Sequence, residues 1–235
     1  MYDTGGLSIK TPTTSMAGMK TDMAGSAAVL GAFAAAVTTG ELTRPLHALL
    51  CIAENSVGPL STRPDDVHRL LSGKTVEVNN TDAEGRLVLS DGVFYAHKHL
   101  QPDVIVDIAT LTGAQLIATG KKHAAIYCSS EGLEDLVVEA GKYTGDLTFP
   151  IPYAPELFRQ EFRSAVADMK NSVTDRGNAQ SSCAGQFIGN HLEEYLALPG
   201  KRWLHVDMAG PATVGDRATG YGVALLFDLV RRLNA

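Results

Sequence analysis

Short aliphatic runs alternate along this chain with longer segments of helical period, and that alternation restricts the fold more than any other feature. Strands and helices in alternation are typical of a layered α/β domain, so we predict an α/β fold. The predicted strands occupy residues 46–53, 104–109, 123–128 and 203–208. The predicted helices occupy residues 23–39, 65–71, 84–99, 133–143, 155–162, 184–196 and 221–233.

The chain has 235 residues, enough to bury a large core, and no repeat, low-complexity tract or linker divides it. We therefore predict a single domain spanning residues 1–235. Gly, Asn and Ser clusters follow nearly every predicted strand, at the strand ends where open α/β sheets carry their sites. Residues 168–182 are predicted to form a long exposed loop, and loops of that length are often functional.

The charge balance limits the classes of partner. With 20 basic and 26 acidic residues the formal net charge is -6. An acidic chain lacks the electrostatic footprint for nucleic acid or an anionic membrane surface. We expect neither partner, and a small neutral or cationic partner fits better.

Cysteine usage and the longest apolar stretch bear on the compartment. Cys51, Cys128 and Cys183 are odd in number and widely spaced, which indicates neither a disulfide framework nor a thiolate zinc site. The stretch 24–37 is too short and too rich in small residues to predict a membrane span, and no signal peptide opens the chain. We expect a cytoplasmic protein.

The segment NNTDAEGRL, residues 79–87, places two carboxylates and a guanidinium at every second position. In an extended backbone Asp82, Glu84 and Arg86 would project to the same side. A solvated loop with an internal ion pair is the simpler interpretation, because exposed charge pairs are common and stabilise little. Other acidic residues in the sequence favour a functional patch instead.

Asp22 precedes a helix built almost wholly from Ala, Gly and small apolar residues. Such a helix is expected to be buried on most sides, and Asp22 is interpreted as its N-cap beside a core. Asp3 stands before a glycine pair that permits a tight turn, and Lys10 follows seven residues later.

If Asp3, Asp22, Asp82 and Glu84 converge, their charges require cations in the same cleft. An oxygen-rich site without Cys or His ligands suits Mg, Mn or, in a hydrolytic two-metal arrangement, Zn. The residues alone do not choose among these metals.

Other catalytic arrangements are less favoured by the sequence. His97 and His99 are two residues apart on a predicted helix and so do not share a face. Cys183, near a helix start, would have a lowered pKa, but no His and Asn partners are indicated for a nucleophile. The GxSxG and P-loop motifs are absent from the sequence. Three further histidines adjoin predicted strands and are interpreted as core or strand-end residues: His47, His123 and His205.

Several segments resemble the signature segments of one enzyme family. NTDAEGRL at 80–87, DTGGLSIK at 3–10 and MKTDMAGSAAV at 19–29 are similar to those of the leucyl aminopeptidase family, the two-metal cytosolic exopeptidases. Residues 53–66 and 164–176 look closest to its probable aminopeptidase-like branch in animals. The resemblance covers essentially the whole chain and implies the C-terminal catalytic domain, a three-layer α/β/α sandwich with a mixed central sheet.

The resemblance also implies roles for the acidic residues. Asp82 and Glu84 would be zinc ligands, with manganese or magnesium as alternatives, and Glu84 and Asp3 would bridge or share two ions. Asp22 would complete the second site. The paired metals would activate water and clamp the tetrahedral intermediate.

The basic residues and the specificity pocket follow from the same resemblance. Arg86 would hold a bicarbonate-like anion acting as general base, and Lys10 would polarise the scissile carbonyl. The matching positions of the apolar first specificity pocket are Met19, Thr110, Gly113, Ala209 and Ala212.

One departure from the family pattern leaves two functions open. The family supplies another metal-ligand lysine five residues before the first aspartate, and here that position falls before Met1; the leading strands of the catalytic sheet are also expected to be missing. The first hypothesis is an aminopeptidase with leucine-like preference for peptides with a free N-terminus, a homo-hexamer in its full-length form. The second is a catalytically impaired homologue or fragment that serves as a binding or assembly subunit.

Overall fold

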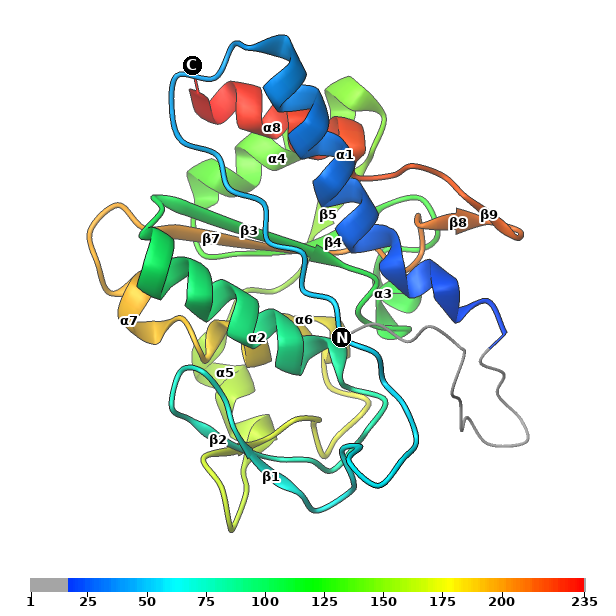
Figure 1. Cartoon of the computed structure of the whole chain (residues 1–235), viewed down its shortest axis with the longest axis vertical. Coiled ribbons are helices and arrows are strands. Elements are labelled where there is room, and N and C mark those ends of the chain that lie inside the picture. Colours follow the sequence, from blue (N-terminus) through cyan, green and yellow to red (C-terminus); the bar gives the residue numbers. More distant parts are fainter. Residues whose placement is uncertain (1–16, 235) are drawn as a thin grey trace.

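The computed structural model describes residues 17–234, and Asp3 and Lys10 therefore lie outside the described residues. A mixed four-stranded sheet runs through the middle of the molecule (Figure 1). Its strand order is β3-β7-β4-β5, with β3 parallel to β7, β7 antiparallel to β4 and β4 parallel to β5. The strands span Val104–Ala109 (β3), Ala124–Cys128 (β4), Thr148–Pro150 (β5) and Arg202–Asp207 (β7).

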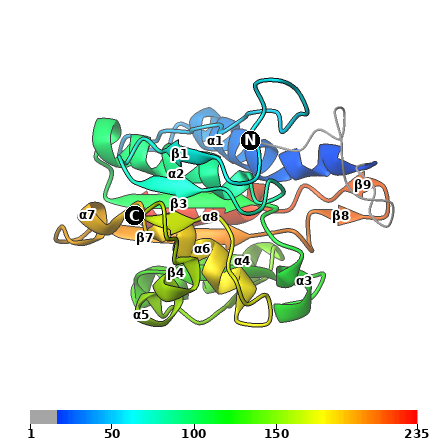
Figure 2. The ribbon, with the colours of Figure 1, turned by 90° about the horizontal axis from the view of Figure 1, so that it is seen from below.

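Helices cover both faces of this sheet. One face packs against α1 (Ala24–Thr39), α4 (Glu131–Thr144) and α8 (Val223–Asn234). The opposite face packs against α2 (Gly85–Tyr95) and α6 (Gln180–Gly189). Figure 2, seen from below, shows β3 and β7 side by side between these helices. The predicted three-layer sandwich with a mixed sheet is confirmed.

The central sheet has a hydrophobic core on each of its two faces, because side chains alternate between the faces along each strand. Trp203 packs in the core on the α2 and α6 side, whereas its neighbour Leu204 packs in the core on the α1, α4 and α8 side. Tyr127 and Ile126 divide between the two cores in the same way. Because successive side chains of a strand point to opposite faces, an unbroken apolar run is what a strand covered on both sides requires.

A second, smaller sheet lies below α2 in Figure 1. It has the order β1-β2-β6, with β1 (Val67–Arg69) antiparallel to β2 (Thr75–Glu77) and β2 parallel to β6 (Met169–Lys170). A separate hairpin joins β8 (Thr213–Val214) and β9 (Arg217–Ala218). The short helices are η1 (Met19–Met23), η2 (Ala96–Leu100), α3 (Ala114–Ala118), α5 (Pro155–Phe158), η3 (Arg159–Phe162) and α7 (Glu193–Leu196).

Three of the predicted strands are confirmed, and one is wrong. β3 begins and ends where predicted, and β4 and β7 differ by one residue at their ends. Residues 46–53 instead form no strand within the described part of the chain. The predicted helix at 65–71 is also wrong, because this stretch turns into β1 and pairs with β2.

The predicted loop at 168–182 is exposed only in its middle. It begins with β6, Asn171 is fully buried, and Ser181 and Ser182 are buried in α6. Buried polar groups at both ends of this stretch carry hydrogen bonds that a freely exposed loop would lack.

The small-sided helix α1 is buried on one stripe only, which corrects the expectation of burial on most sides. Gly25, Ala28, Ala32 and Ala36 are buried, whereas Leu30 is 54% exposed. The stretch Met19–Thr39 is the one described helix that meets the length and hydropathy of a membrane span, with 22% of its apolar window buried. Its buried stripe packs in the core with the sheet and α8.

Candidate active site

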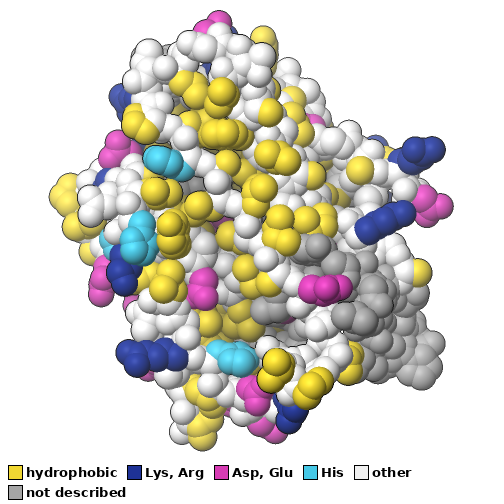
Figure 3. All heavy atoms as spheres, in the orientation of Figure 1, with side chains coloured by type: hydrophobic (Ala, Val, Ile, Leu, Met, Phe, Trp, Pro, Cys, Tyr) yellow, Lys and Arg dark blue, Asp and Glu magenta, His cyan; other side chains and the backbone are white. Residues whose placement is uncertain are grey.

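A cavity of about 510 Å³ opens between the front of the central sheet, α1 and the start of α2. Eight of the predicted site residues line it: Met19, Asp22, Asp82, Glu84, Arg86, Thr110, Gly113 and Ala209. The structure therefore brings together acidic, basic and apolar residues that are nearly 190 positions apart in sequence. Figure 3 shows this face of the molecule, with acidic side chains set among apolar ones.

Asp22 reaches the cavity from η1, and its interpretation as an N-cap is wrong. The N-cap of α1 is Met23, and no side chain caps that helix. The Asp22 carboxylate instead accepts a hydrogen bond of 2.5 Å from the Thr110 hydroxyl, at the end of β3. A short helical turn before α1 directs this carboxylate toward the sheet rather than toward the helix's own amides.

Gly25 allows α1 to approach β3 closely enough for that contact. A Cβ atom at Gly25 would lie 2.3 Å from the carbonyl oxygen of Ile108, which no side chain tolerates. Glycine is required here for the close approach of two backbones rather than for a turn. The small residue at this position thus sets where Asp22 stands relative to the loop that follows β3.

The DxExR segment is a loop running into a helix, so the predicted extended alternation is wrong. Glu84 is the N-cap of α2 and has helical torsion angles (φ -77, ψ -37), and Arg86 lies in the first turn of α2. Glu84 and Arg86 are 7% and 8% exposed, whereas Asp82 is exposed. All three nevertheless line the cavity, because the chain turns into the helix at its rim.

Asn171 holds the acidic loop, residues 79–86, in place, and the sequence analysis did not predict this role. Its Oδ1 accepts hydrogen bonds from the backbone amides of Asn79 and Asn80 at 3.0 and 3.2 Å. Its Nδ2 donates to the carbonyls of Asn80 and Ala83. One buried amide side chain thus satisfies four backbone groups of a loop that has no sheet or helix of its own. Its position inside the candidate loop 168–182 was the one available signal.

Arg86 is buried and strongly desolvated. Its Nη1 donates to the backbone carbonyl of Asn171 at 3.0 Å, and its Nε is buried with no hydrogen-bond partner among residues 17–234. Burial lowers the pKa of Arg86 to about 10, while Asp207, Cys183 and Glu84 oppose that shift. A guanidinium with an unused donor beside a cavity is suited to binding an anion.

Asp207, at the end of β7, organises the other rim. Its carboxylate accepts from the backbone amides of Leu111 and Thr112, from the Thr112 hydroxyl at 2.6 Å and from Ser181. Burial raises the pKa of Asp207, and His205 and these donors act in the opposite direction. The loop that carries Thr110 and Gly113 is therefore held by one buried carboxylate.

Below that rim lies a buried polar network. His205 and Trp203 both bond to the carboxylate of Asp107, at 2.5 and 2.7 Å. Burial alone would lower the pKa of His205, but the Asp107 and Asp207 carboxylates raise it above its ordinary value. His205 is thus a satisfied core residue on its Nδ1 side, as interpreted from sequence.

Of the remaining candidates, His47 lines the cavity, whereas Ala212, Cys183, His97 and His99 do not. Ala212 is 3% exposed and packs in the core on the α1, α4 and α8 side rather than lining the cavity. Burial raises the pKa of the Cys183 thiol to about 11, which is the opposite of an activated nucleophile. His97 packs edge-on against Tyr195, and His99 packs against Tyr95.

The fold and this cavity define a known class of protein. A family model described as the cytosol aminopeptidase family, catalytic domain, matches residues 1–227, and the chain belongs to that family. Aminopeptidases of this family are generally metal-dependent. The predicted similarity to the animal aminopeptidase-like branch is confirmed.

Individual relatives are similar over the whole chain. The probable aminopeptidase NPEPL1 of Homo sapiens is 61% identical over 234 residues, covering 100% of this chain and 44% of that protein. Leucine aminopeptidase 1 of Caenorhabditis elegans is 52% identical, and the solved structure of that worm enzyme superposes with a TM-score of 0.92 over 100% of this chain. The apo leucyl aminopeptidase of Trypanosoma cruzi gives 53% identity and a TM-score of 0.92. The chain spans less than half the length of these relatives.

The donor set agrees with metal binding in its chemistry. Asp22, Asp82 and Glu84 offer carboxylate oxygens to one cavity, the ligand type that hard divalent cations and zinc accept. Within residues 17–234 no three His, Cys, Asp or Glu side chains stand close enough together to hold an ion. The described residues therefore fit a metal site as a partial donor set, with Asp3 predicted as a further ligand.

Proposed function

We propose that this chain is the catalytic part of a metal-dependent aminopeptidase that releases N-terminal residues, with leucine-like preference, from peptides. The observation that carries the proposal is the convergence of Asp22, Asp82, Glu84 and Arg86 on one cavity in a member of the cytosol aminopeptidase family. A free substrate amine and an acidic cavity are complementary in charge, which suits exopeptidase cleavage.

Asp3, Asp22, Asp82 and Glu84 would hold two divalent ions, zinc foremost, with manganese or magnesium as alternatives. Such ions, when bound, lower the pKa of coordinated water and polarise the scissile carbonyl. The burial of Glu84 against α2 restricts where its carboxylate can stand, so the ligand geometry is set before substrate arrives.

Arg86 would anchor a bicarbonate-like anion that takes up the proton of the attacking water. Its Nη1 is fixed by the Asn171 carbonyl, so the guanidinium is oriented by the same residue that holds the acidic loop. Lys10 would stabilise the oxyanion that forms at the substrate carbonyl.

The substrate's first side chain would lie against the wall formed by Met19, Thr110, Gly113 and Ala209, whereas Ala212 packs in the core and is not part of this wall. Met19 supplies an adaptable thioether at this wall, and Gly113 leaves open space, since a Cβ there would meet nothing within 4 Å. Asp207 keeps the Thr110–Gly113 side of the wall in one conformation through its bonds to Leu111 and Thr112.

Homo-hexameric assembly of the full-length form and a cytoplasmic location complete the proposal. The names of several relatives support the location, since bacterial homologues 39–44% identical to this chain are called probable cytosol aminopeptidases. The alternative is a catalytically impaired homologue that serves as a binding or assembly subunit. A metal titration separates the two, because a competent site holds two ions and an impaired one holds a single ion tightly.

The direct test is hydrolysis of leucine amide by residues 1–235 supplied with zinc or manganese. Glu84→Gln removes a charge that both ions need, so we expect turnover to fall to the metal-free background. Glu194→Gln, an exposed substitution of the same kind on α7, should retain wild-type turnover. Equal activity in the two variants would refute the two-metal assignment, and no turnover in the parent chain would favour the impaired alternative.

Arg86→Ala should lower turnover less than Glu84→Gln, because bulk bicarbonate or water partly replaces an anchored base. Added bicarbonate should restore part of the lost rate in this variant. A loss equal to that of Glu84→Gln would assign Arg86 a different role.

A further inference from the structure

Four buried ionisable side chains gather beneath the candidate active site, and the proposed function uses only Arg86. His205 and Asp207 alternate along β7, so both point to the α2 and α6 face of the central sheet, as Trp203 does. Asp107 stands opposite His205 in the register of β3. Arg86 acts electrostatically on His205 from the first turn of α2. The charge state of this group therefore bears on the floor of the site.

Five donated hydrogen bonds converge on the carboxyl group of Asp207 and favour its ionised form. They come from the amides of Leu111, Thr112 and Ala209 and from the hydroxyls of Thr112 and Ser181. Hydrogen bonds donated to a carboxyl group stabilise its charged form. Asp207 can hold the loop after β3 through all of these bonds only as a carboxylate.

A fully buried carboxylate also needs a cation nearby. Burial raises the pKa of Asp207, and the charge of His205 is the strongest influence against that rise. Arg86, the other cation of this group, donates through Nη1 to the carbonyl of Asn171. His205 is therefore the better placed counter-ion for Asp207.

The bonds of Asp107 fix one nitrogen of the His205 ring. A carboxylate can only accept, so Nδ1 of His205 carries the hydrogen in its 2.5 Å contact with Asp107. Trp203 donates to the other oxygen of Asp107 at 2.7 Å, which holds that carboxylate against the ring. Burial and the charge of Arg86 lower the pKa of His205, but the Asp107 and Asp207 carboxylates outweigh them and raise it.

The other elements around His205 add no further cation among the described residues. On β4, Tyr127 stands opposite His205, and α6 carries Cys183 on the same face of the sheet. Burial raises the pKa of both side chains, so both are neutral. From α2 the charged groups are Arg86 and Glu84, and Glu84 acts on Arg86.

The charges of the four buried groups balance only if His205 is protonated. Asp107, Asp207, the guanidinium of Arg86 and an imidazolium sum to zero. A neutral imidazole would leave one buried carboxylate without a counter-charge, which is costly in surroundings that exclude water.

We propose that His205 is a positioning residue of the candidate active site: its imidazolium, bonded to Asp107, is the counter-ion that lets Asp207 hold residues 110–113. That loop carries Thr110, which bonds to Asp22, and Gly113 of the specificity wall. His205 does not line the cavity, so it acts through Asp207 rather than on the substrate. The inference rests on the proposed function for the role of the loop, whereas the charge of His205 is independent of catalysis.

The first test measures ring protonation by ¹⁵N NMR on the whole 235-residue chain, labelled at its histidines. We expect both ring nitrogens of His205 to carry hydrogen at about pH 7 and still at about pH 8. His205→Gln assigns the signal by its loss. His191 is the internal control, because burial lowers its pKa to about 4 and its ring should be neutral. A neutral His205 ring at about pH 7 would overturn the proposal.

The second test separates charge from packing. His205→Gln keeps a donor for Asp107 but loses the counter-charge, so amide exchange at Leu111 and Thr112 should become at least about tenfold faster. Adding Asp107→Asn removes one carboxylate as well and restores the neutral sum. Exchange in this double variant should return to within about threefold of the parent rate.

A double variant that exchanges as fast as His205→Gln would show that His205 acts by packing alone, which would overturn the proposal. If His205→Gln does not fold, recovery of the fold in the double variant supports the same conclusion, and its failure contradicts it. His191→Gln, at a buried histidine that does not line the cavity, should leave exchange at Leu111 and Thr112 unchanged.

Turnover of leucine amide separates this inference from the proposed function. Without its counter-ion Asp207 takes up a proton more readily, so His205→Gln should move the acid limb of kcat/KM upward by about one pH unit. The double variant should restore the parent's limb. An unmoved limb would overturn the link between His205 and the site. A parent chain without turnover would contradict the proposed function, and ring protonation and amide exchange would still decide the role of His205.

Discussion

Two regions border the same cavity and are held in opposite ways. The acidic loop, residues 79–86, has its backbone groups satisfied by a side chain about 90 positions away, that of Asn171. Residues 45–49 and 51 border the cavity on another side and belong to no helix or strand. Both regions largely lack regular secondary structure, but the first is held by a buried side chain, whereas Leu49, Leu50 and Ile52 beside the second are 37%, 39% and 47% exposed.

The difference shows where this chain has fixed geometry. The proposed metal ligands and the proposed anion-binding guanidinium would need positions held to a fraction of an ångström, and the hydrogen bonds from the Asn171 side chain to the backbone provide such a restraint. The acidic loop is tied further by Asn79, whose side chain exchanges two hydrogen bonds with the backbone of Ser172. The apolar wall at residues 45–49 needs no such restraint, because hydrophobic contact is not directional.

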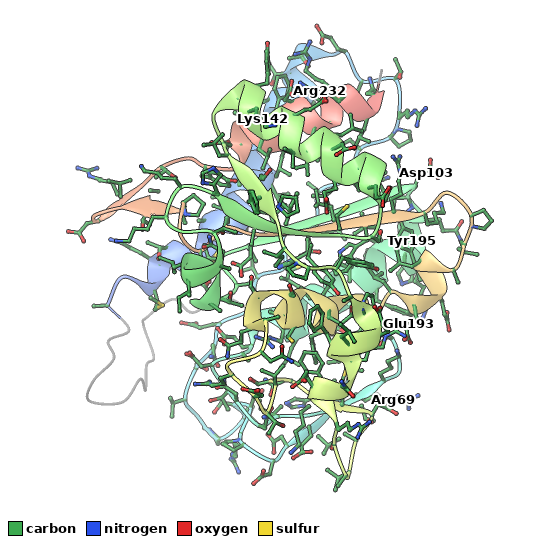
Figure 4. All side chains as sticks on the ribbon, turned by 180° about the vertical axis from the view of Figure 1, so that it is seen from behind. Arg69, Asp103, Lys142, Glu193, Tyr195 and Arg232 are labelled. Carbon is green, nitrogen blue, oxygen red and sulfur yellow. The ribbon has the colours of Figure 1, made fainter. Side chains whose placement is uncertain are left out.

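The small sheet that supports the acidic loop is itself tied to α6 and α7. Ser72 bonds to Nδ1 of His191 at 2.7 Å, and Lys74 donates to the Asn190 carbonyl and to Glu193. Figure 4 shows Glu193 at this side of the molecule, seen from behind. The restraint on the site therefore extends from Asn171 through β6 and β2 to the helices behind it.

The largest effect on this comparison is expected from Asn171→Ala. The substitution leaves two amides and two carbonyls of the acidic loop without their side-chain partner, and we expect unfolding free energy to fall by roughly 3–4 kcal/mol. Chemical denaturation measures that loss. Metal affinity of the folded fraction should fall as well, because the loop would no longer hold Asp82 and Glu84.

Asn178→Ala is the matched control for this substitution. Asn178 is half-buried and makes one side-chain bond, to Glu161, so its loss should cost less than about 1 kcal/mol. If the two variants were equally stable, the acidic loop would not depend on the hydrogen bonds of the Asn171 side chain. The two regions would then not differ in how they are held.

The sequence predicted most of the regular elements of the molecule and eight of the residues that line the cavity. β3, β4 and β7 are continuous apolar runs, and a run of this kind has few alternatives to a buried strand. The acidic and basic site residues were predicted from motif resemblance, and those within the described residues line one cavity. Their roles remain predictions.

What the sequence did not predict depends on partners distant in the chain. Residues 46–53 have a strand-like composition, but a strand forms only if a neighbour completes its ladder, and composition carries no information about that neighbour. Asn171 was missed for a similar reason, since nothing in its own neighbourhood indicates a bond to residues 79–83. Aspartate is a common N-cap residue, but in the structure the Asp22 carboxylate accepts a hydrogen bond from Thr110, which is far away in the sequence.

Gly25→Ala sharpens the comparison at the point where α1 packs closely against the end of β3. The added Cβ would lie 2.3 Å from the Ile108 carbonyl oxygen, so α1 must move away from β3. We expect a loss of about 2–3 kcal/mol in unfolding free energy, measured by thermal or chemical denaturation. The Asp22 to Thr110 bond should be lost with it, which a weaker metal affinity would report.

Gly31→Ala in the same helix is the control. Its Cβ would meet a methyl group of Val223 at 3.0 Å, and a side chain can yield where a backbone carbonyl cannot. The higher helix propensity of alanine offsets that contact, so stability should change by less than about 1 kcal/mol. Equal losses in the two variants would show that the close approach at Gly25 does not restrain α1.

The smallest expected effect is a pH dependence of stability that arises at His191, whose Nδ1 bonds to Ser72 next to the small sheet. Burial lowers the pKa of His191 to about 4, and the charge of Lys74 acts in the same direction. The unfolded chain binds this proton near pH 6.5 and the folded chain does not until about pH 4. Stability from this residue is therefore complete above about pH 6.5 and falls as the pH drops toward 4, by about 1–2 kcal/mol between pH 7 and pH 5.

His191→Asn removes the titrating group and keeps a side chain able to bond to Ser72. The variant's unfolding free energy should vary less between about pH 7 and pH 5 than that of the parent chain, measured by urea denaturation at each pH. His99→Asn, at an exposed position, should leave the parent's pH dependence unchanged. If the unfolding free energy of the His191 variant changed with pH as much as that of the parent chain, protonation of His191 would not destabilise the small sheet. Any loss of stability at low pH would then have to arise from carboxylates.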